Sequence, residues 1–208
     1  MNRVIYQAYP HFYNKMNAFV EENKTIKSCD ICFVGDSLTE MMNVKNFKNL
    51  NCVNRGISSD KSAGILMTLD DRVIAINPKQ IFLLIGSNDI CDGYTIKEIE
   101  YNIKDIIAYC KEKLKDVRIV VSTVLPPCYY DGSHIDKAYP NCRDILRIKA
   151  LNEIIKTLKD DKNNIDVFDS YSLLKDENDS LSLDDTLDGV HLTEKAYNKL
   201  KEKLSTIL

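Results

Sequence analysis

The sequence has no long hydrophobic run near its start, no internal repeat and no low-complexity tract or linker. Without a continuous apolar segment in residues 1–19, we expect neither a signal peptide nor a membrane span. Nothing divides the 208 residues into parts, and a chain of this length can bury a full hydrophobic core. We therefore predict a single domain over residues 1–208.

An excess of one charge is also missing, since the net charge is −3 and both signs are mixed along the chain. This balance argues against nucleic acid or an anionic membrane surface as a partner. The composition leaves a homodimer open.

Metal-binding patterns are scarce. The seven cysteines include a single Cys-x-x-Cys pair, Cys29 and Cys32, with no second pair or nearby histidine that would complete a metal site. We therefore expect reduced thiols that pack as small hydrophobic side chains. Reduced thiols and the lack of an export signal together predict a cytoplasmic protein.

What the sequence does contain is a regular alternation of short apolar runs and amphipathic segments. We predict strands at 30–35, 51–56, 81–85, 117–121 and 165–168. We predict helices at 9–20, 60–76, 96–114 (with a capping box at Thr95 and Glu98), 145–158 and from about 193 onward. The run 81–85 is apolar throughout, as in a central parallel strand covered on both faces. The alternation predicts a three-layer α/β/α domain, flavodoxin-like, with a five-stranded parallel sheet in the order 2-1-3-4-5.

Ser37 lies just beyond the first predicted strand, which ends at Gly35. Open α/β sheets bind their ligands outside the carboxyl ends of the strands, so this serine is placed where a substrate would lie. If a helix begins here, its free N–H groups point at whatever the hydroxyl attacks. We interpret Ser37 as a nucleophile.

His191 differs from the other two histidines because it follows Asp188 by three residues. At this spacing a carboxylate and an imidazole can lie side by side. The carboxylate would hold the Nδ1 proton and leave Nε2 free to accept a proton from the serine. Taken alone, such a pair is common by chance and is better explained by a capping or surface role.

Two further positions could stabilise a developing oxyanion. Asn88 follows the apolar strand 81–85 and could donate from its side-chain amide, although a turn or capping role is an alternative. Gly56 ends the second strand and could donate its N–H, although a tight turn would also require glycine. With the N–H of Ser37, these groups supply the donors that acyl transfer needs.

Four short blocks resemble the SGNH hydrolases, also called GDSL-type esterases, and occur in that family's order. The blocks are Gly35-Asp36-Ser37-Leu38-Thr39, Asn54-Arg55-Gly56, Gly86-Ser87-Asn88-Asp89 and Asp188-Gly189-Val190-His191. They look closest to the branch that includes platelet-activating-factor acetylhydrolase-like and carbohydrate acetylesterase proteins.

The resemblance implies a flavodoxin-like α/β/α fold and hydrolysis of a small-molecule ester without metal or cofactor. It assigns Ser37 as the nucleophile, His191 as the general base and then acid, and Asp188 as the residue that orients His191. Gly56 and Asn88 would complete the oxyanion hole.

The substrate pocket is less well indicated by the sequence. We expect its walls in the loop 122–140 and the irregular stretch 170–187, with Asp36, Tyr129 and Tyr130 as pocket residues. The tyrosines could equally close the loop on itself. No amphipathic lid is evident, which favours a short acyl group such as acetyl on a small alcohol or carbohydrate.

Other functions remain open at this point. An acyltransferase would use the same three residues with an alcohol in place of water, and a lysophospholipase or platelet-activating-factor-acetylhydrolase-like enzyme would act on lipid esters. A flavodoxin-like binding module is the non-catalytic alternative, but the carboxylate of Asp36 would repel a flavin phosphate. A phosphoester hydrolase is disfavoured because the motif loops lack clustered basic residues or metal carboxylates.

Overall fold

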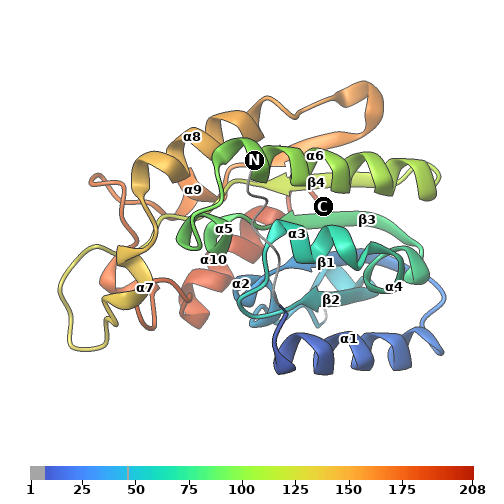
Figure 1. Cartoon of the computed structure of the whole chain (residues 1–208), viewed down its shortest axis with the longest axis horizontal. Helices are drawn as coiled ribbons and strands as arrows, with labels where there is room; N and C mark the ends of the chain where they lie inside the picture. The colour runs from blue at the N-terminus through green and yellow to red at the C-terminus, as the bar shows by residue number, and fades with distance from the viewer. Residues whose placement is uncertain (1–7, 46) are drawn as a thin grey trace.

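The computed structural model describes residues 8–45 and 47–208 and contains one five-stranded sheet (Figure 1). All neighbouring strands are parallel, in the order β2-β1-β3-β4-β5. The strands are β1 (Cys29–Gly35), β2 (Cys52–Gly56), β3 (Pro78–Leu84), β4 (Arg118–Ser122) and β5 (Ile165–Phe168). The predicted α/β/α fold and strand order are confirmed.

Helices cover both faces of this sheet. They are α1 (Pro10–Asn23), α2 (Ser37–Glu40), α3 (Ser62–Met67), α4 (Leu69–Arg72), α5 (Ser87–Cys91), α6 (Ile96–Lys113), α7 (Ala138–Asn141), α8 (Ile145–Lys156), α9 (Ser170–Leu174) and α10 (Glu194–Leu204). One core lies between the sheet and α3, α4, α6 and α8. A second core lies between the opposite face and α2, α9 and α10.

The central strands supply both cores because alternate side chains of a strand point to opposite faces. In β3, Ile81 and Leu83 join the first core, whereas Phe82 and Leu84 join the second. All four side chains are nearly inaccessible to solvent. This two-sided burial explains why the run reads as continuously apolar.

The long helices lie where the sequence predicts them, but the stretches expected to be a loop and irregular contain α7 and α9, and one predicted helix is divided. The capping box of Thr95 and Glu98 at the start of α6 is confirmed. The helix predicted at 60–76 is instead divided into α3, α4 and a 3₁₀ turn at Ile74–Ile76. The division falls at Thr68, whose backbone leaves the helical region and whose hydroxyl donates to the carbonyl of Gly64. This local hydrogen bond competes with the helical ladder.

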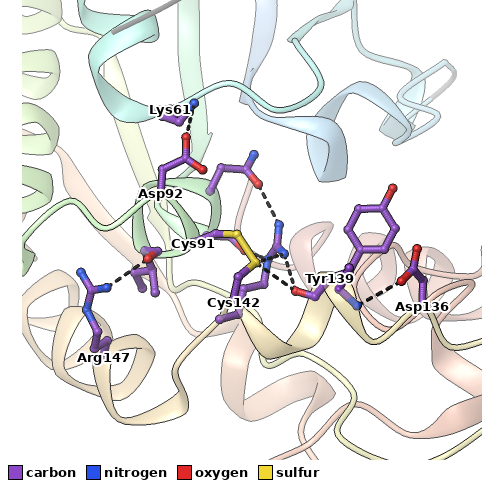
Figure 2. Close-up of a disulfide and its surroundings, with 12 residues drawn as sticks. Lys61, Cys91, Asp92, Asp136, Tyr139, Cys142 and Arg147 are labelled. Carbon is purple, nitrogen blue, oxygen red and sulfur yellow. Dashed lines mark hydrogen bonds and ion pairs between the residues drawn. A yellow bond between two sulfur atoms is a disulfide. The ribbon is translucent and has the colours of Figure 1, made fainter. Parts of the chain in front are cut away.

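The expectation of reduced cysteines is wrong for one pair. Cys91, the last residue of α5, forms a disulfide with Cys142, which follows α7 (Figure 2). The two residues are 51 apart in sequence, so their pairing depends on how two loops meet in space. The cytoplasmic expectation assumed uniformly reduced thiols, and this pair does not meet that assumption.

The long segment between β4 and α8 extends past the sheet at the end where α2 and α5 lie (Figure 1). It carries α7 and packs against the segment that precedes α10 through backbone hydrogen bonds. The N–H of Cys128 donates to Gly189, and that of Asp136 donates to Asp188. Within the described residues, no helix combines the length and apolarity required to cross a bilayer.

Candidate active site

Ser37 and His191 lie 154 residues apart in sequence but meet at the carboxyl end of the sheet. The distance from His191 Nε2 to Ser37 Oγ is 2.9 Å. On the other side of the ring, His191 Nδ1 lies 2.5 Å from Asp188 Oδ2. Hydroxyl, imidazole and carboxylate therefore form one continuous hydrogen-bonded line, the arrangement that activates a serine for nucleophilic attack.

The position of Ser37 depends on two glycines that let α2 approach the strand ends closely. A Cβ atom at Gly35 would lie 2.2 Å from the hydroxyl oxygen of Thr39 in α2, and one at Gly56 would lie 2.2 Å from the backbone nitrogen of Glu40. Both distances are far below any real contact, so only glycine allows this packing. The first residue of α2, Ser37, is thereby held at the end of β1.

Asp36, which we expected to line the substrate pocket, lies at the N-terminus of α2. Its side chain is buried, and its carboxylate accepts the N–H of Leu38 and so caps α2. Burial raises the pKa of Asp36 to about 7, against the opposing effects of the Leu38 N–H and the positive charge of Arg143. Asp36 thus supports the turn that presents Ser37.

The carboxylate of Asp188 is held by its own turn. Its Oδ1 accepts the N–H groups of Val190 and His191, at 3.0 and 2.9 Å. Gly189 supports this turn with a φ of +111°, a region that side chains disfavour. Burial raises the pKa of Asp188, but the hydrogen bonds from the His191 side chain and backbone outweigh burial and leave the pKa below its ordinary value. The carboxylate is therefore ionised at neutral pH.

Of the tyrosines in the long loop, Tyr139 is the one that contacts His191. Its ring meets the imidazole edge-on, with ring centroids 5.6 Å apart. Tyr129 instead donates its hydroxyl to the carbonyl of Arg143, and Tyr130 donates to the carboxylate of Asp176. In the structure these two tyrosines bond to other parts of the protein, as expected if they close the loop instead of lining a substrate pocket.

The two expected oxyanion donors differ in their present partners. The N–H of Gly56 donates to the side-chain oxygen of Asn54 at 2.8 Å, so an oxyanion would have to share or replace that acceptor. The Asn88 amide donates one N–H to the carbonyl of Asp60 at 3.0 Å. An amide nitrogen carries two hydrogens, which leaves a second N–H of Asn88 for a ligand.

Arg143 is a residue of this region that the sequence did not reveal. Its guanidinium is buried and donates to the side-chain oxygens of Ser87 and Asn88, at 2.7 and 2.8 Å. Arg143 lies 55 residues beyond Asn88, in a stretch without strand or helix periodicity, so no pattern connected the two. In the described residues, no three His, Cys, Asp or Glu side chains gather as a metal site would require.

The chain is similar in sequence to known acetylhydrolase subunits. The chain is 26% identical over 198 residues to platelet-activating factor acetylhydrolase IB subunit alpha1 of Bos taurus, covering 91% of this chain and 79% of that protein. It is also 26% identical over 200 residues to the alpha2 subunit of Homo sapiens, covering 92% and 81%.

Solved structures show the same fold. A GDSL-like lipase from Bacteroides thetaiotaomicron superimposes with a TM-score of 0.77 at 23% identity, covering 94% of this chain and 97% of that one. The acetylxylan esterase Axe2 from Geobacillus stearothermophilus superimposes with a TM-score of 0.63 at 18% identity, covering 86% and 94%. The model of the GDSL-like lipase/acylhydrolase family matches residues 33–199, which is most of the chain. The protein therefore belongs to the GDSL-like lipase/acylhydrolase family and is an ester hydrolase of the esterase and lipase type.

Proposed function

We propose that this protein is a serine esterase that hydrolyses carboxylic esters through an acyl-enzyme on Ser37. The observation that carries the proposal is the line of two hydrogen bonds that runs from Ser37 through His191 to Asp188. A surface histidine or a helix cap would not need this geometry. Here the imidazole separates a buried hydroxyl from an ionised carboxylate, which is what a general base requires.

In the first half of the reaction, Ser37 Oγ attacks the ester carbonyl carbon and passes its proton to His191 Nε2. The carboxylate of Asp188 stabilises the imidazolium that results. Donors at the site, with the free Asn88 N–H and the Ser37 N–H foremost, would stabilise the oxyanion of the tetrahedral intermediate. Collapse of this intermediate breaks the bond to the alcohol, which leaves with the proton from Nε2.

In the second half, water attacks the acyl group on Ser37 while His191 accepts a proton from it. Collapse of the second intermediate returns that proton to Ser37 Oγ and releases the carboxylic acid. The cycle needs no electron transfer, and the protein returns to its starting protonation state.

The substrate we propose is a short-chain ester, with acetyl as the acyl group and a small alcohol or carbohydrate as the leaving group. The names of two relatives support this choice, since one is an acetylhydrolase and the other an acetylxylan esterase. The first name also supports a lipid ester as the alternative substrate. A panel of acetyl-sugar esters, p-nitrophenyl esters of increasing chain length and a platelet-activating-factor-type lipid distinguishes the two.

The experiment that tests the mechanism is labelling by a fluorophosphonate, with the adduct mapped by mass spectrometry. We expect a single adduct on Ser37, no adduct in Ser37→Ala, and much slower labelling in His191→Ala. An adduct on another residue, or no labelling of the folded wild type, would contradict the proposal. In the latter case, a flavin absorbance spectrum would support the non-catalytic binding module.

Hydrolysis and acyl transfer differ only in the acceptor that attacks the acyl-enzyme. Product analysis with and without an added alcohol separates the two, because a transferase forms a new ester in preference to the free acid. The homodimer and the cytoplasmic location are also proposals; light scattering of the purified protein and fractionation of the source cells test them.

A further inference from the structure

The positively charged side chain of Arg143 is buried between α5 and the segment around Tyr139, both of which contribute to the candidate site. Its side chain is only 7% exposed, and all three guanidinium nitrogens donate hydrogen bonds. The oxygen acceptors are the hydroxyl of Ser87, the amide oxygen of Asn88 and the carbonyl of Tyr139, and one nitrogen also donates to Cys142 Sγ. These oxygens are neutral, so the bonds offset the desolvation of the charge less well than a carboxylate would. A residue needed only for packing could be apolar at this position.

The consequence of these bonds is seen at the Asn88 amide. Its oxygen accepts from Arg143 and its nitrogen donates to the carbonyl of Asp60. Rotating the amide by half a turn would place NH₂ against the guanidinium and oxygen against a carbonyl, which is unfavourable on both sides. The amide is therefore held in the one orientation that keeps an N–H available to an oxyanion.

The charge also strengthens this donor. A guanidinium at the oxygen end draws electron density away from the amide nitrogen, which makes the remaining N–H a better donor, because hydrogen bonds in a chain polarise one another. Orientation and polarisation thus act on the same N–H.

We propose that Arg143 is a positioning residue for the oxyanion hole, acting through Asn88. The inference rests on the proposed esterase function. It assigns to Arg143 no contact with the substrate, because each of its three nitrogens already bonds to the protein. Removing it should therefore lower the rate of the chemical step more than the affinity for substrate.

A second arginine provides a matched control. Arg147, in the first turn of α8, donates to the carbonyls of Ile90 and Tyr94 and so holds the end of α5 from the other side. Figure 2 shows Arg147 near the Cys91–Cys142 disulfide, with its guanidinium directed at a backbone acceptor. Arg147 secures the same segment as Arg143 but does not bond to the Asn88 side chain.

The test is a double-mutant cycle on Arg143 and Asn88, with kcat and KM measured on p-nitrophenyl acetate and Tm measured for every variant. For Arg143→Met we expect kcat to fall by about 10²-fold with a small change in KM, as small displacements at a reacting centre do. Arg143→Lys keeps the charge but loses the fork of donors, and should fall in between. Arg147→Met should lower Tm while kcat stays within a few-fold of the wild type.

The decisive measurement is the effect of the Arg143 change in the Asn88→Ala background, where we expect no further loss of kcat. Additive losses, a loss confined to KM, or an equal loss of kcat in Arg147→Met would each overturn the inference. Either Arg143 variant suffices for the cycle if the other does not fold. An inactive wild type would overturn the proposed function and this inference together, whereas additivity in an active enzyme overturns only the inference.

Discussion

The hydroxyl of Tyr197 donates a 2.8 Å hydrogen bond to the carbonyl oxygen of Leu38, 159 residues away in sequence. Leu38 follows Ser37 in α2, and Tyr197 lies in the first turns of α10, shortly after His191. This buried hydrogen bond links α2, which begins with Ser37, to α10, which follows His191. Ser37 and His191 are therefore held together by the fold as well as by their own contact.

Tyr197→Phe should destabilise the protein, because it removes one buried hydrogen bond and leaves the Leu38 carbonyl without that donor. We expect the free energy of unfolding to fall by about 1–3 kcal/mol, measured by urea denaturation. Tyr109→Phe is the matched control, since its hydroxyl bonds to Asp70 at the surface, where water can replace it. Equal losses of unfolding free energy in the two variants would show that the bond to Leu38 stabilises the protein no more than the surface bond to Asp70.

Asn88→Ala should leave a folded protein with a kcat reduced by about 10²–10³-fold, as removal of one oxyanion donor does in other enzymes. Asn178→Ala serves as the control, because its amide bonds to the hydroxyl of Tyr130 at the surface, in a contact that holds a loop. Steady-state kinetics on an acetyl ester give the kcat of both variants. An unchanged kcat in Asn88→Ala would remove this residue from the mechanism.

The buried carboxyl of Asp36 should make stability depend on pH. Its pKa is about 7 in the folded protein against 3.8 in a free chain, so between these values the folded state holds a proton that the unfolded state has lost. Stability from this group is therefore full below about pH 4 and falls as the pH rises to 7. Asp36→Asn keeps an acceptor for the Leu38 N–H and removes the titration.

Relative to Asp36→Asn, the wild type should lose at most about 4 kcal/mol of unfolding free energy between pH 4 and 7. Asp179→Asn provides a control of opposite sign. Hydrogen bonds from Lys149 and Lys175 hold the pKa of Asp179 well below its usual range, so its contribution is lost as the pH falls. That loss begins only near pH 4, so urea denaturation between pH 4 and 7 should show a changing gap between wild type and Asp36→Asn and a nearly constant gap between wild type and Asp179→Asn. A constant gap between wild type and Asp36→Asn would contradict the prediction.

Reduction of the Cys91–Cys142 disulfide should lower stability, because the bond closes a loop of about 51 residues. Loop entropy limits the loss to about 4 kcal/mol. A reducing agent should lower the Tm of the wild type and leave the Tm of a Cys91→Ser, Cys142→Ser double variant unchanged. If the reducing agent shifts both proteins equally, or neither, the bond does not form in solution or does not stabilise the fold.

Much of the architecture could be predicted from the sequence because its signals are local. The apolar run of β3 reports burial on both faces, and the capping box at Thr95 reports the start of α6. The order of the strands then followed from general rules for parallel sheets. The division of the helix at Thr68 was missed because the helical pattern of apolar residues continues past the point where the backbone leaves the helical region.

By itself, the sequence determined the α/β/α class, the strand order and the residue types that esterase chemistry uses. These features could be predicted because periodicity and short motifs depend on residues that are close together in the chain. The resemblance to a known family led us to expect that His191 meets Ser37, and the structure places them 2.9 Å apart. Only the tertiary structure decided that Arg143 meets Asn88 and that Cys91 meets Cys142. It also decided that Asp36 is buried as a helix cap. These facts depend on loop paths beyond the sheet, and loops carry no periodic signal from which their contacts could be predicted.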